Sequence, residues 1–216
     1  YIDAVEPDAG RLMLHYKFDE TSGLNVTDSS GQGNHGYIDM QTGLPPAWTP
    51  EGHTNGCLSF NDDTAIEVPT DTLSGVDRQL SVCVWLNGSG PAGRENVILE
   101  TGSGDTFLRA DVPDDAGMAY FRAGAADDAV IWSGLSDEHW RDNWSHWAFV
   151  RDGAAGILRI YRNAQPVAET TGAFGNLHSL PGNTFDIGAM ISHRNDYNGL
   201  MDDLRIYSYA LAQGEI

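Results

Sequence analysis

Short runs of alternating apolar and polar residues, separated by turn-forming residues, dominate the chain. Residues 80–86 alternate in this way, and residues 12–18 place four apolar side chains on one face: Leu12, Leu14, Tyr16 and Phe18. Residues 158–162 and 204–207 repeat the pattern. A period of two is typical of half-buried β-strands. No segment has a convincing helical period, and the only helical hint is a short turn over residues 210–216.

One run breaks the alternation. Residues 146–150, His-Trp-Ala-Phe-Val, are apolar on both faces, which predicts a central strand covered on each side. Turn dipeptides such as Asn55-Gly56, Asn87-Gly88 and Asp152-Gly153 separate the runs from one another. The 25 glycines and roughly a dozen short strands predict an all-β fold, a two-sheet antiparallel β-sandwich.

The length fits a single domain. A chain of 216 residues that is 41% hydrophobic can bury one full core. Residues 1–10 contain Pro7 and Gly10 and little apolar content, so they are expected to be a linker remnant before a domain over residues 11–216. No apolar run approaches the roughly 18 residues of a membrane span, so no membrane insertion is expected. The chain reads as a mature or excised segment of a larger protein.

The charge is strongly negative, with 31 acidic and 12 basic residues and a net charge of −19. Such a field repels nucleic acid and anionic lipid, favours cations, and aids solubility. The two cysteines, Cys57 and Cys83, fit no zinc pattern. They lie in separate predicted strands, so a disulfide is geometrically possible but not implied, and free buried thiols are slightly favoured.

Three segments, read in order, resemble the laminin-G-like, concanavalin-A-like jellyroll family. The first is residues 14–23 with the loop at 28–36, the second is 144–153 followed by 158–163, and the third is 199–216. The resemblance implies a jellyroll and a secreted, lectin-like module. One departure is Asn163-Ala164, where the family's hairpin usually carries Asn-Gly. Because alanine disfavours left-handed backbone, this departure predicts a turn of another type or length.

The resemblance also implies a structural Ca²⁺ site, held by Asp19, Asp202 and loop oxygens around Asn34 and His35. Ca²⁺ takes six to eight oxygen ligands, which carboxylates and the carbonyls of a glycine-rich loop supply. Alternation places Asp202 on the apolar face of its strand, and a buried carboxylate there needs a cation or several donors. The alternative is that Asp202 caps loop amides by hydrogen bonds alone.

An enzyme is not expected. Jellyroll glycosidases carry two carboxylates on one face of a strand in the pattern E-x-D-x-x-E, and no such run occurs. Jellyroll lyases need arginine, histidine and tyrosine around one cleft, and Arg122 lacks such partners. His35 and His146 have neither a nucleophile elbow nor a third zinc ligand at a recognisable spacing. We therefore expect them to be satisfied or surface histidines.

The six tryptophans suggest a sugar-binding surface. Trp85, Trp144 and Trp147 lie in predicted core strands and are expected to be structural. Exposed aromatic rings beside polar groups suit sugars, and this reasoning selects five candidate ligand-binding residues: Trp132, Trp140, Arg194, Asp196 and Tyr197.

The expected function is therefore a non-catalytic carbohydrate-binding module of a larger secreted bacterial protein. Its expected partners are a glycan or polysaccharide, neutral rather than acidic, and other domains of the same parent chain, and it is expected to be a monomer. The alternative is an adhesion, protein-interaction or spacer module without a glycan ligand.

Overall fold

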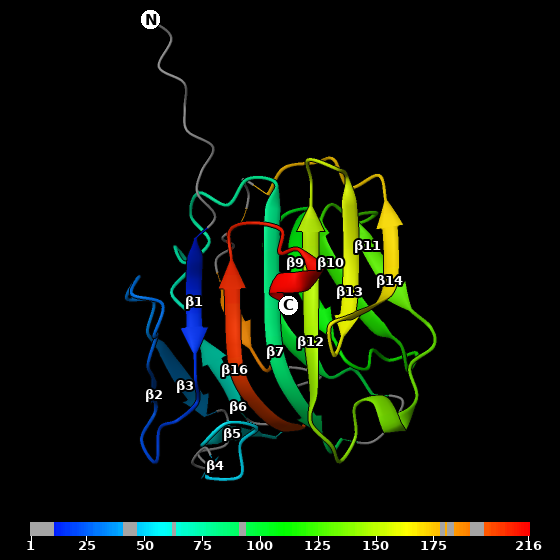
Figure 1. Cartoon of the computed structure of the whole chain (residues 1–216). Coiled ribbons are helices and arrows are strands. Elements are labelled where there is room, and N and C mark those ends of the chain that lie inside the picture. The colour runs from blue at the N-terminus through cyan, green and yellow to red at the C-terminus, as the bar shows by residue number, and fades with distance from the viewer. Residues whose placement is uncertain are drawn as a thin grey trace, which may run out of the picture.

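The structure is a computed structural model that describes residues 11–40, 47–61, 64–90, 94–177, 180, 184–190 and 197–216. Within these residues, two antiparallel sheets of eight strands each lie face to face, one in front of the other in Figure 1. This architecture confirms the predicted all-β sandwich of the jellyroll kind. Among the described residues, no helix is long and apolar enough to cross a membrane.

Sheet A has the order β14-β13-β12-β7-β16-β5-β4, and β1 pairs with β16 beside β5. Its strands are β1 (Leu12–Tyr16), β4 (Ala47–Thr49), β5 (Cys57–Phe60), β7 (Gln79–Gly88), β12 (Ser145–Asp152), β13 (Ile157–Arg162), β14 (Gln165–Thr171) and β16 (Gly199–Tyr207).

Sheet B has the order β11-β10-β9-β8-β15-β6-β3-β2. Its strands are β2 (Asn25–Val26), β3 (Gly36–Met40), β6 (Thr64–Glu67), β8 (Val97–Ser103), β9 (Thr106–Asp111), β10 (Ala119–Gly124), β11 (Ala129–Trp132) and β15 (Phe185–Ile187). Two short 3-10 helices complete the described elements, η1 (Asp137–His139) and η2 (Gln213–Glu215).

Strand β12 is covered on both faces, as its sequence predicts. Trp147 and Phe149 are fully buried in the core between the sheets. On the opposite face, Ala148 and Val150 pack in a small cluster with Leu211 of the C-terminal segment. Figure 1 shows this segment, with η2 in red, crossing in front of β7 and β12. The C-terminal segment therefore shields the apolar part of the outer face of sheet A.

The first strand departs from the expected alternation. Its pairing with β16 shifts register between Leu12 and Leu14, and Met13 rather than Leu12 is buried in the core. A bulge of this kind puts an extra residue into one strand and changes the face of the residues before it. The prediction that Leu12 shares the core face of Leu14 is therefore wrong.

The two cysteines are free and buried. Burial raises the pKa of both thiols to about 12, so neither is a reactive thiolate at neutral pH. This result agrees with the favoured prediction from sequence.

The hairpin between β13 and β14 keeps a two-residue turn despite its alanine. Arg162 pairs with Gln165, and both turn residues have positive φ, 48° at Asn163 and 60° at Ala164. Positive φ at both positions is the requirement of the tight hairpin turn that Asn-Gly usually fills. The expected change of turn type or length is therefore wrong, because the chain accepts strained backbone at Ala164 instead.

This strain predicts that Ala164→Gly stabilises the protein. Glycine adopts positive φ without the Cβ clash, and we expect a gain of about 0.5–1 kcal/mol, or about 2 °C in Tm. The matched control is Ala212→Gly, because Ala212 is also exposed but has an ordinary φ of −73°. Calorimetry should show a higher Tm only for the Ala164 variant, and an unchanged or lower Tm there contradicts the interpretation.

Candidate functional site

Two adjoining cavities lie on the outer face of sheet A and share Asp203 and Arg205. The first has a volume of about 550 Å³ and is lined by Trp85, Trp144, His146, Asn163, Ala164, Asp203, Arg205 and Ile216. The second has a volume of about 260 Å³ and is lined by His15, Lys17, Asp19, Thr54, Asn55, Asp202, Asp203 and Arg205. We call the two together the outer-face groove. The C-terminal segment bounds it through Ile216.

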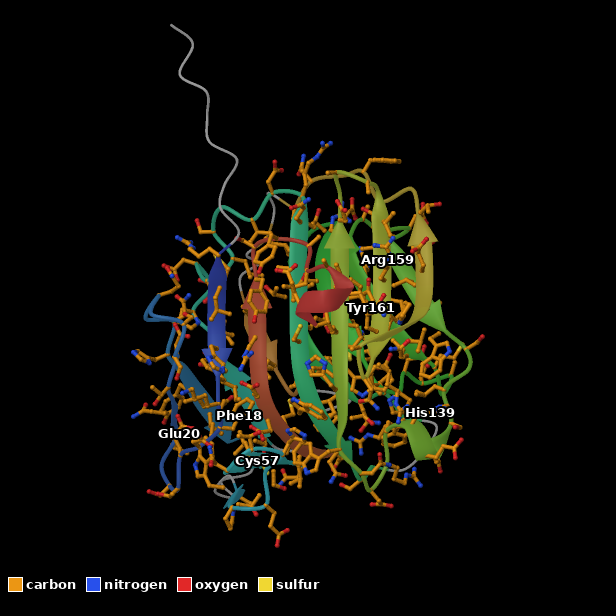
Figure 2. All side chains as sticks on the ribbon, viewed as in Figure 1. Phe18, Glu20, Cys57, His139, Arg159 and Tyr161 are labelled. Atoms are coloured by element: carbon orange, nitrogen blue, oxygen red, sulfur yellow. The ribbon has the colours of Figure 1, made fainter. Side chains whose placement is uncertain are left out.

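The surrounding surface is seen from the outside in Figure 2, where Tyr161 is labelled on β13 near the C-terminal segment. Tyr161 belongs to the apolar cluster that this segment covers. The groove lies next to this covered cluster, and Ile216 of the C-terminal segment belongs to both.

Aromatic rings gather at one end of the groove. The His53 ring stacks on Trp85 with centroids 3.4 Å apart and planes 10° apart, and Trp144 meets the edge of His53 at 6.2 Å. His146 lies 5.1 Å from Trp85. Burial lowers the pKa of His146, so this imidazole is uncharged at neutral pH. Trp85 and Trp144 are only half-buried. Trp85 lies in the predicted strand, with its ring on the outer face, whereas Trp144 lies one residue before β12 and not in a core strand as expected.

The polar half of the groove depends on a bulge in β16. Asp202 pairs with Trp85 and Arg205 pairs with Cys83, so two residues of β16 lie opposite one residue of β7. Asp203 has a φ of 50°, in the left-handed region. Because of the extra residue, both Asp202 and Asp203 line the outer cavity while Leu204 stays in the core. The predicted position of Asp202 on the apolar face is wrong for this reason.

Asp203 is held by two basic side chains. His15 Nε2 lies 2.6 Å from Asp203 Oδ1, and Arg205 contacts both carboxylate oxygens, Nε at 3.1 Å and Nη2 at 2.9 Å. Burial alone raises the pKa of this carboxyl, but the hydrogen bond with His15 and the charge of Arg205 bring it below its usual value. Asp203 is therefore a fixed carboxylate at neutral pH.

Asp202 is in the opposite situation. It is 1% exposed, and one hydrogen bond to Oδ2 comes from the backbone N–H of Thr54 at 2.7 Å. Burial raises its pKa to about 6, the Thr54 hydrogen bond opposes the change, and the charges of Asp203 and Asp19 add to it. The structure thus keeps a buried carboxylate at the base of the groove, with backbone hydrogen bonds from Thr54 and Asp203 and two negative neighbours.

The loop over residues 52–56 carries the His53 ring and donates backbone hydrogen bonds to two carboxylates of the groove, Asp202 and Asp19. The N–H of Gly56 donates to Asp19 Oδ1 at 3.1 Å. A Cβ on Gly56 would lie 3.1 Å from the carbonyl oxygen of Phe18, so glycine allows the loop to approach this closely. Phe18, buried and adjacent to Asp19, has a φ of 57°. Strained residues of this type concentrate at functional sites.

The residues expected to hold Ca²⁺ are only partly brought together. Asp19 and Asp202 line the same cavity and repel each other, which suits a cation between them. Asn34 does not line that cavity: its N–H donates to Asp28 Oδ2 at 2.9 Å and its Nδ2 to the carbonyl of Met13 at 2.9 Å. Over the part of the chain that the structure describes, no group of three or more His, Cys, Asp or Glu side chains is arranged to hold a metal.

The residues expected to bind sugar do not form one surface. Trp140 is 2% exposed and packs on Gly88, where a Cβ would lie 2.4 Å from the ring. Tyr197 is fully buried, 6.1 Å from Phe60 in an edge-on contact. The expectation of exposed rings at Trp140 and Tyr197 is therefore wrong, because both rings complete the core.

The other three candidates have different outcomes. Trp132 is half-buried, with its centroid 6.1 Å from Trp147 and 5.0 Å from His139. Arg194 and Asp196 lie outside the described residues.

Sequence reasoning missed Trp85 although the signal was present. The core positions Leu80, Val82, Val84 and Leu86 leave Trp85 out of phase, on the opposite face. Arg205 carried the same signal, because it alternates with Leu204 and Ile206. Asp203 carried none, since the bulge that places it is a feature of pairing between distant strands.

Comparison with protein families gives a match to the laminin G model described as the concanavalin A-like lectin/glucanases superfamily, over residues 60–216. A comparison with the sequences of curated proteins finds no match.

Solved structures share the fold at low sequence identity. Domain 4 of AbnA, a GH43 extracellular arabinanase from Geobacillus stearothermophilus, in complex with arabinotriose, is similar with a TM-score of 0.75 and 21% identity, over 95% of this chain and 96% of that one. The binding domain of botulinum neurotoxin serotype G has a TM-score of 0.71 and 13% identity, over 95% of this chain and 49% of that one.

A third similar structure is the binding domain of botulinum neurotoxin DC in complex with rat synaptotagmin II. It has a TM-score of 0.68 and 11% identity, over 94% of this chain and 50% of that one. The chain thus spans about half of each neurotoxin domain.

The pKa shifts of Asp202 and Asp203 have opposite signs, so the two carboxyl groups should affect the pH dependence of stability in opposite ways. A folded pKa of about 6 at Asp202, above its unfolded value, gives stability that is present below about pH 4 and lost as pH rises through 6. Asp202→Asn removes this loss, on the order of 2 kcal/mol. Without added metal, its Tm relative to wild type should rise by several degrees between pH 5 and pH 7.5.

Asp203→Asn is the matched control, because its folded pKa is lowered. The stability from this group is present above the unfolded pKa and is lost only as pH falls through the folded pKa. Between pH 5 and pH 7.5 its Tm relative to wild type should therefore change much less than that of Asp202→Asn, because this variant removes only the Asp203 contribution to the raised pKa of Asp202. Parallel pH profiles for wild type and Asp202→Asn in that window would falsify the assignment.

Proposed function

Because the chain belongs to the concanavalin A-like lectin/glucanases superfamily, we propose that it is a lectin-like module whose outer-face groove binds a glycan without cleaving it. The observation that carries this proposal is the pair of half-buried indoles, Trp85 and Trp144, beside Asp203 and Arg205. The apolar C–H face of a sugar ring packs on an indole, while its hydroxyls need donors and acceptors at the ring edge.

The polar residues beside the indoles can supply the donors and acceptors that sugar hydroxyls need. Asp203 offers carboxylate oxygens to sugar hydroxyls, and its contacts with His15 and Arg205 hold it in place before any ligand arrives. Preformed polar groups avoid the entropy loss of ordering side chains upon binding.

A neutral glycan is the ligand most compatible with the negative net charge of the protein. The net charge of −19 disfavours sulfated or uronic polysaccharides, and Arg205 is already paired with Asp203. The similar arabinanase domain was solved with arabinotriose, so neutral arabino-oligosaccharides are the first ligands to test. By the same likeness, we propose an extracellular setting as one module of a larger bacterial chain.

The alternative is a protein-interaction module. Three exposed apolar side chains favour it, Tyr37 at 49%, Ile131 at 51% and Phe174 at 57% exposure, and one neurotoxin domain of this fold was solved with synaptotagmin II. This alternative predicts no glycan affinity in the groove.

Removing the indole tests the glycan proposal. Trp85→Ala should weaken arabinotriose binding at least tenfold in calorimetric titration, because the variant removes one indole from the groove together with the ring on which His53 stacks, and one aromatic contact contributes on the order of 1–2 kcal/mol. Asp203→Asn should weaken it by a similar factor without disturbing the backbone, because asparagine tolerates a φ of 50°.

Trp132→Ala serves as the comparison, because Trp132 is one of the five residues that the sequence suggested for sugar binding and lies in β11 of sheet B. Binding should persist in that variant. If wild type binds none of a panel of neutral glycans, or if Trp132→Ala alone abolishes binding, the groove is not the glycan site. Tm values for each variant separate lost binding from lost folding.

We also propose a structural Ca²⁺ between Asp19 and Asp202. Their mutual repulsion and the raised pKa of Asp202 support this placement, because a bound cation relieves both. The two carboxylates supply part of the oxygen set that Ca²⁺ needs, and backbone carbonyls must supply the rest.

Calcium addition should therefore raise the Tm, and EDTA should lower it. At a hundredfold excess over Kd, a ligand that binds only the folded state adds about 2.7 kcal/mol, equivalent to several degrees here. Asp202→Asn should abolish the difference between calcium and EDTA, whereas Asp71→Asn should keep it, because Asp71 is exposed and lines neither cavity of the groove. A wild-type melting curve identical in calcium and in EDTA rules out the site.

A further inference from the structure

A separate cavity of about 360 Å³ opens on the outer face of sheet B. Its floor is formed by β8, β9 and β10, where Arg109 and Asp111 alternate with the core residues Leu108 and Ala110. The residues that line it are Glu95, Glu100, Phe107, Arg109, Asp111, Asp114, Asp115, Tyr120 and Arg122. We call it the sheet B cavity. It faces away from the outer-face groove, across the whole core.

Both arginines of the cavity are already occupied. Arg109 Nε donates to both oxygens of Asp111 at 2.9 and 3.1 Å, and its Nη2 lies 2.9 Å from Glu95. Arg122 donates to backbone carbonyls, including that of Asp105 at 2.7 Å, and its guanidinium lies 4.9 Å from the Phe107 ring centroid. Neither cation is therefore available to an anionic ligand.

Five carboxylates against two arginines leave the lining acidic. Asp114 is satisfied by the N–H groups of Ala116 and Met118, at 3.0 and 2.7 Å. Glu100 is different: it is 6% exposed, and its Oε2 accepts no hydrogen bond within the described residues. Its closest cation there is Arg109 Nη1, at 3.7 Å.

The excess of negative charge in the sheet B cavity favours the binding of another cation. Burial raises the pKa of Glu100 and Glu95 adds to the shift, while the charges of Arg109 and Arg122 oppose it. Burial likewise raises the pKa of Asp111, against the effect of Arg109, whose guanidinium binds both of its oxygens. A positive group that donates hydrogen bonds in this cavity would supply the hydrogen bond that the buried Glu100 Oε2 lacks and would reduce the mutual repulsion of the carboxylates.

The geometry favours an organic cation over a metal ion. Within the described residues, these carboxylates do not form a group of three arranged for a metal. Tyr120, half-buried and paired across the sheet with Asp111, adds an aromatic ring beside the acidic groups. An ammonium group has three donors for the carboxylates, and the carbons that carry it pack on such a ring.

We propose that the sheet B cavity binds a ligand with a primary ammonium group, through Glu100 and its neighbouring carboxylates. An amino-sugar unit and a lysine side chain both carry this group. The net charge of −19 draws either one toward the protein. This site is independent of the glycan proposal for the outer-face groove.

Acetylation of the amine provides the direct test. Calorimetric titration at pH 6 compares a glucosamine trimer with its N-acetylated form, and a lysine tripeptide with its Nε-acetylated form. The free amines should bind at least tenfold more tightly than the acetylated ligands, and the tighter of the two amines identifies the source. Equal binding of free and acetylated forms in both pairs, or no binding by either amine, overturns the proposal.

Variants locate the interaction. Glu100→Gln should weaken amine binding at least tenfold, whereas Glu138→Gln removes one charge from the exposed surface of η1 and should leave it unchanged. The Trp85→Ala variant should also bind the amines normally, since Trp85 lies in the outer-face groove of sheet A and not in the sheet B cavity. If Glu100→Gln fails to fold, Glu95→Gln takes its place. Unaltered binding in the folded cavity variant, or equal weakening by Glu138→Gln, overturns the assignment.

Discussion

Strand β16 is the element on which the arrangement of sheet A depends. It pairs with β7 along one edge and with β5 and β1 along successive halves of the other. Its bulge, with left-handed backbone at Asp203, lies between the β5 and β1 halves. The extra residue returns Leu204 and Ile206 to the core, so the apolar packing between the sheets continues on both sides of it. The same residue turns a second carboxylate toward solvent.

The polar site is therefore a product of the way the strand is accommodated. A regular β16 would place Asp202 and Asp203 on opposite faces, and one carboxylate would enter the core without a partner. The bulge avoids that loss. The structure instead has one carboxylate fixed by His15 and Arg205, and another, Asp202, that is buried beneath the loop at 52–56. Buried charges without full compensation lower stability, and they persist where they have another use.

The sequence was sufficient for the sandwich and for the two-sided burial of β12, because local alternation and composition encode them. It left the state of Cys57 and Cys83 open, since the pairing of two cysteines depends on which strands lie side by side. It was sufficient in principle for the outward direction of Trp85, whose phase against Val84 and Leu86 determines its face. The bulges at Met13 and Asp203 could not be predicted from the sequence, because they arise where strands far apart in the chain come into register. Trp140 and Tyr197 were misassigned because residues in irregular segments can complete a core that alternation does not describe.

The C-terminal segment gives the groove one wall that is ordered by folding itself. Leu211 N donates to Ser81 Oγ at 2.9 Å, and Gln213 Nε2 donates to the carbonyl of Ala164 at 2.9 Å, so the last turn is tied both to β7 and to the strained hairpin. Ile216 and Ala164 line the same cavity. The entropy of ordering this wall is lost when the chain folds, and a ligand that enters the groove meets a surface that is already preorganised.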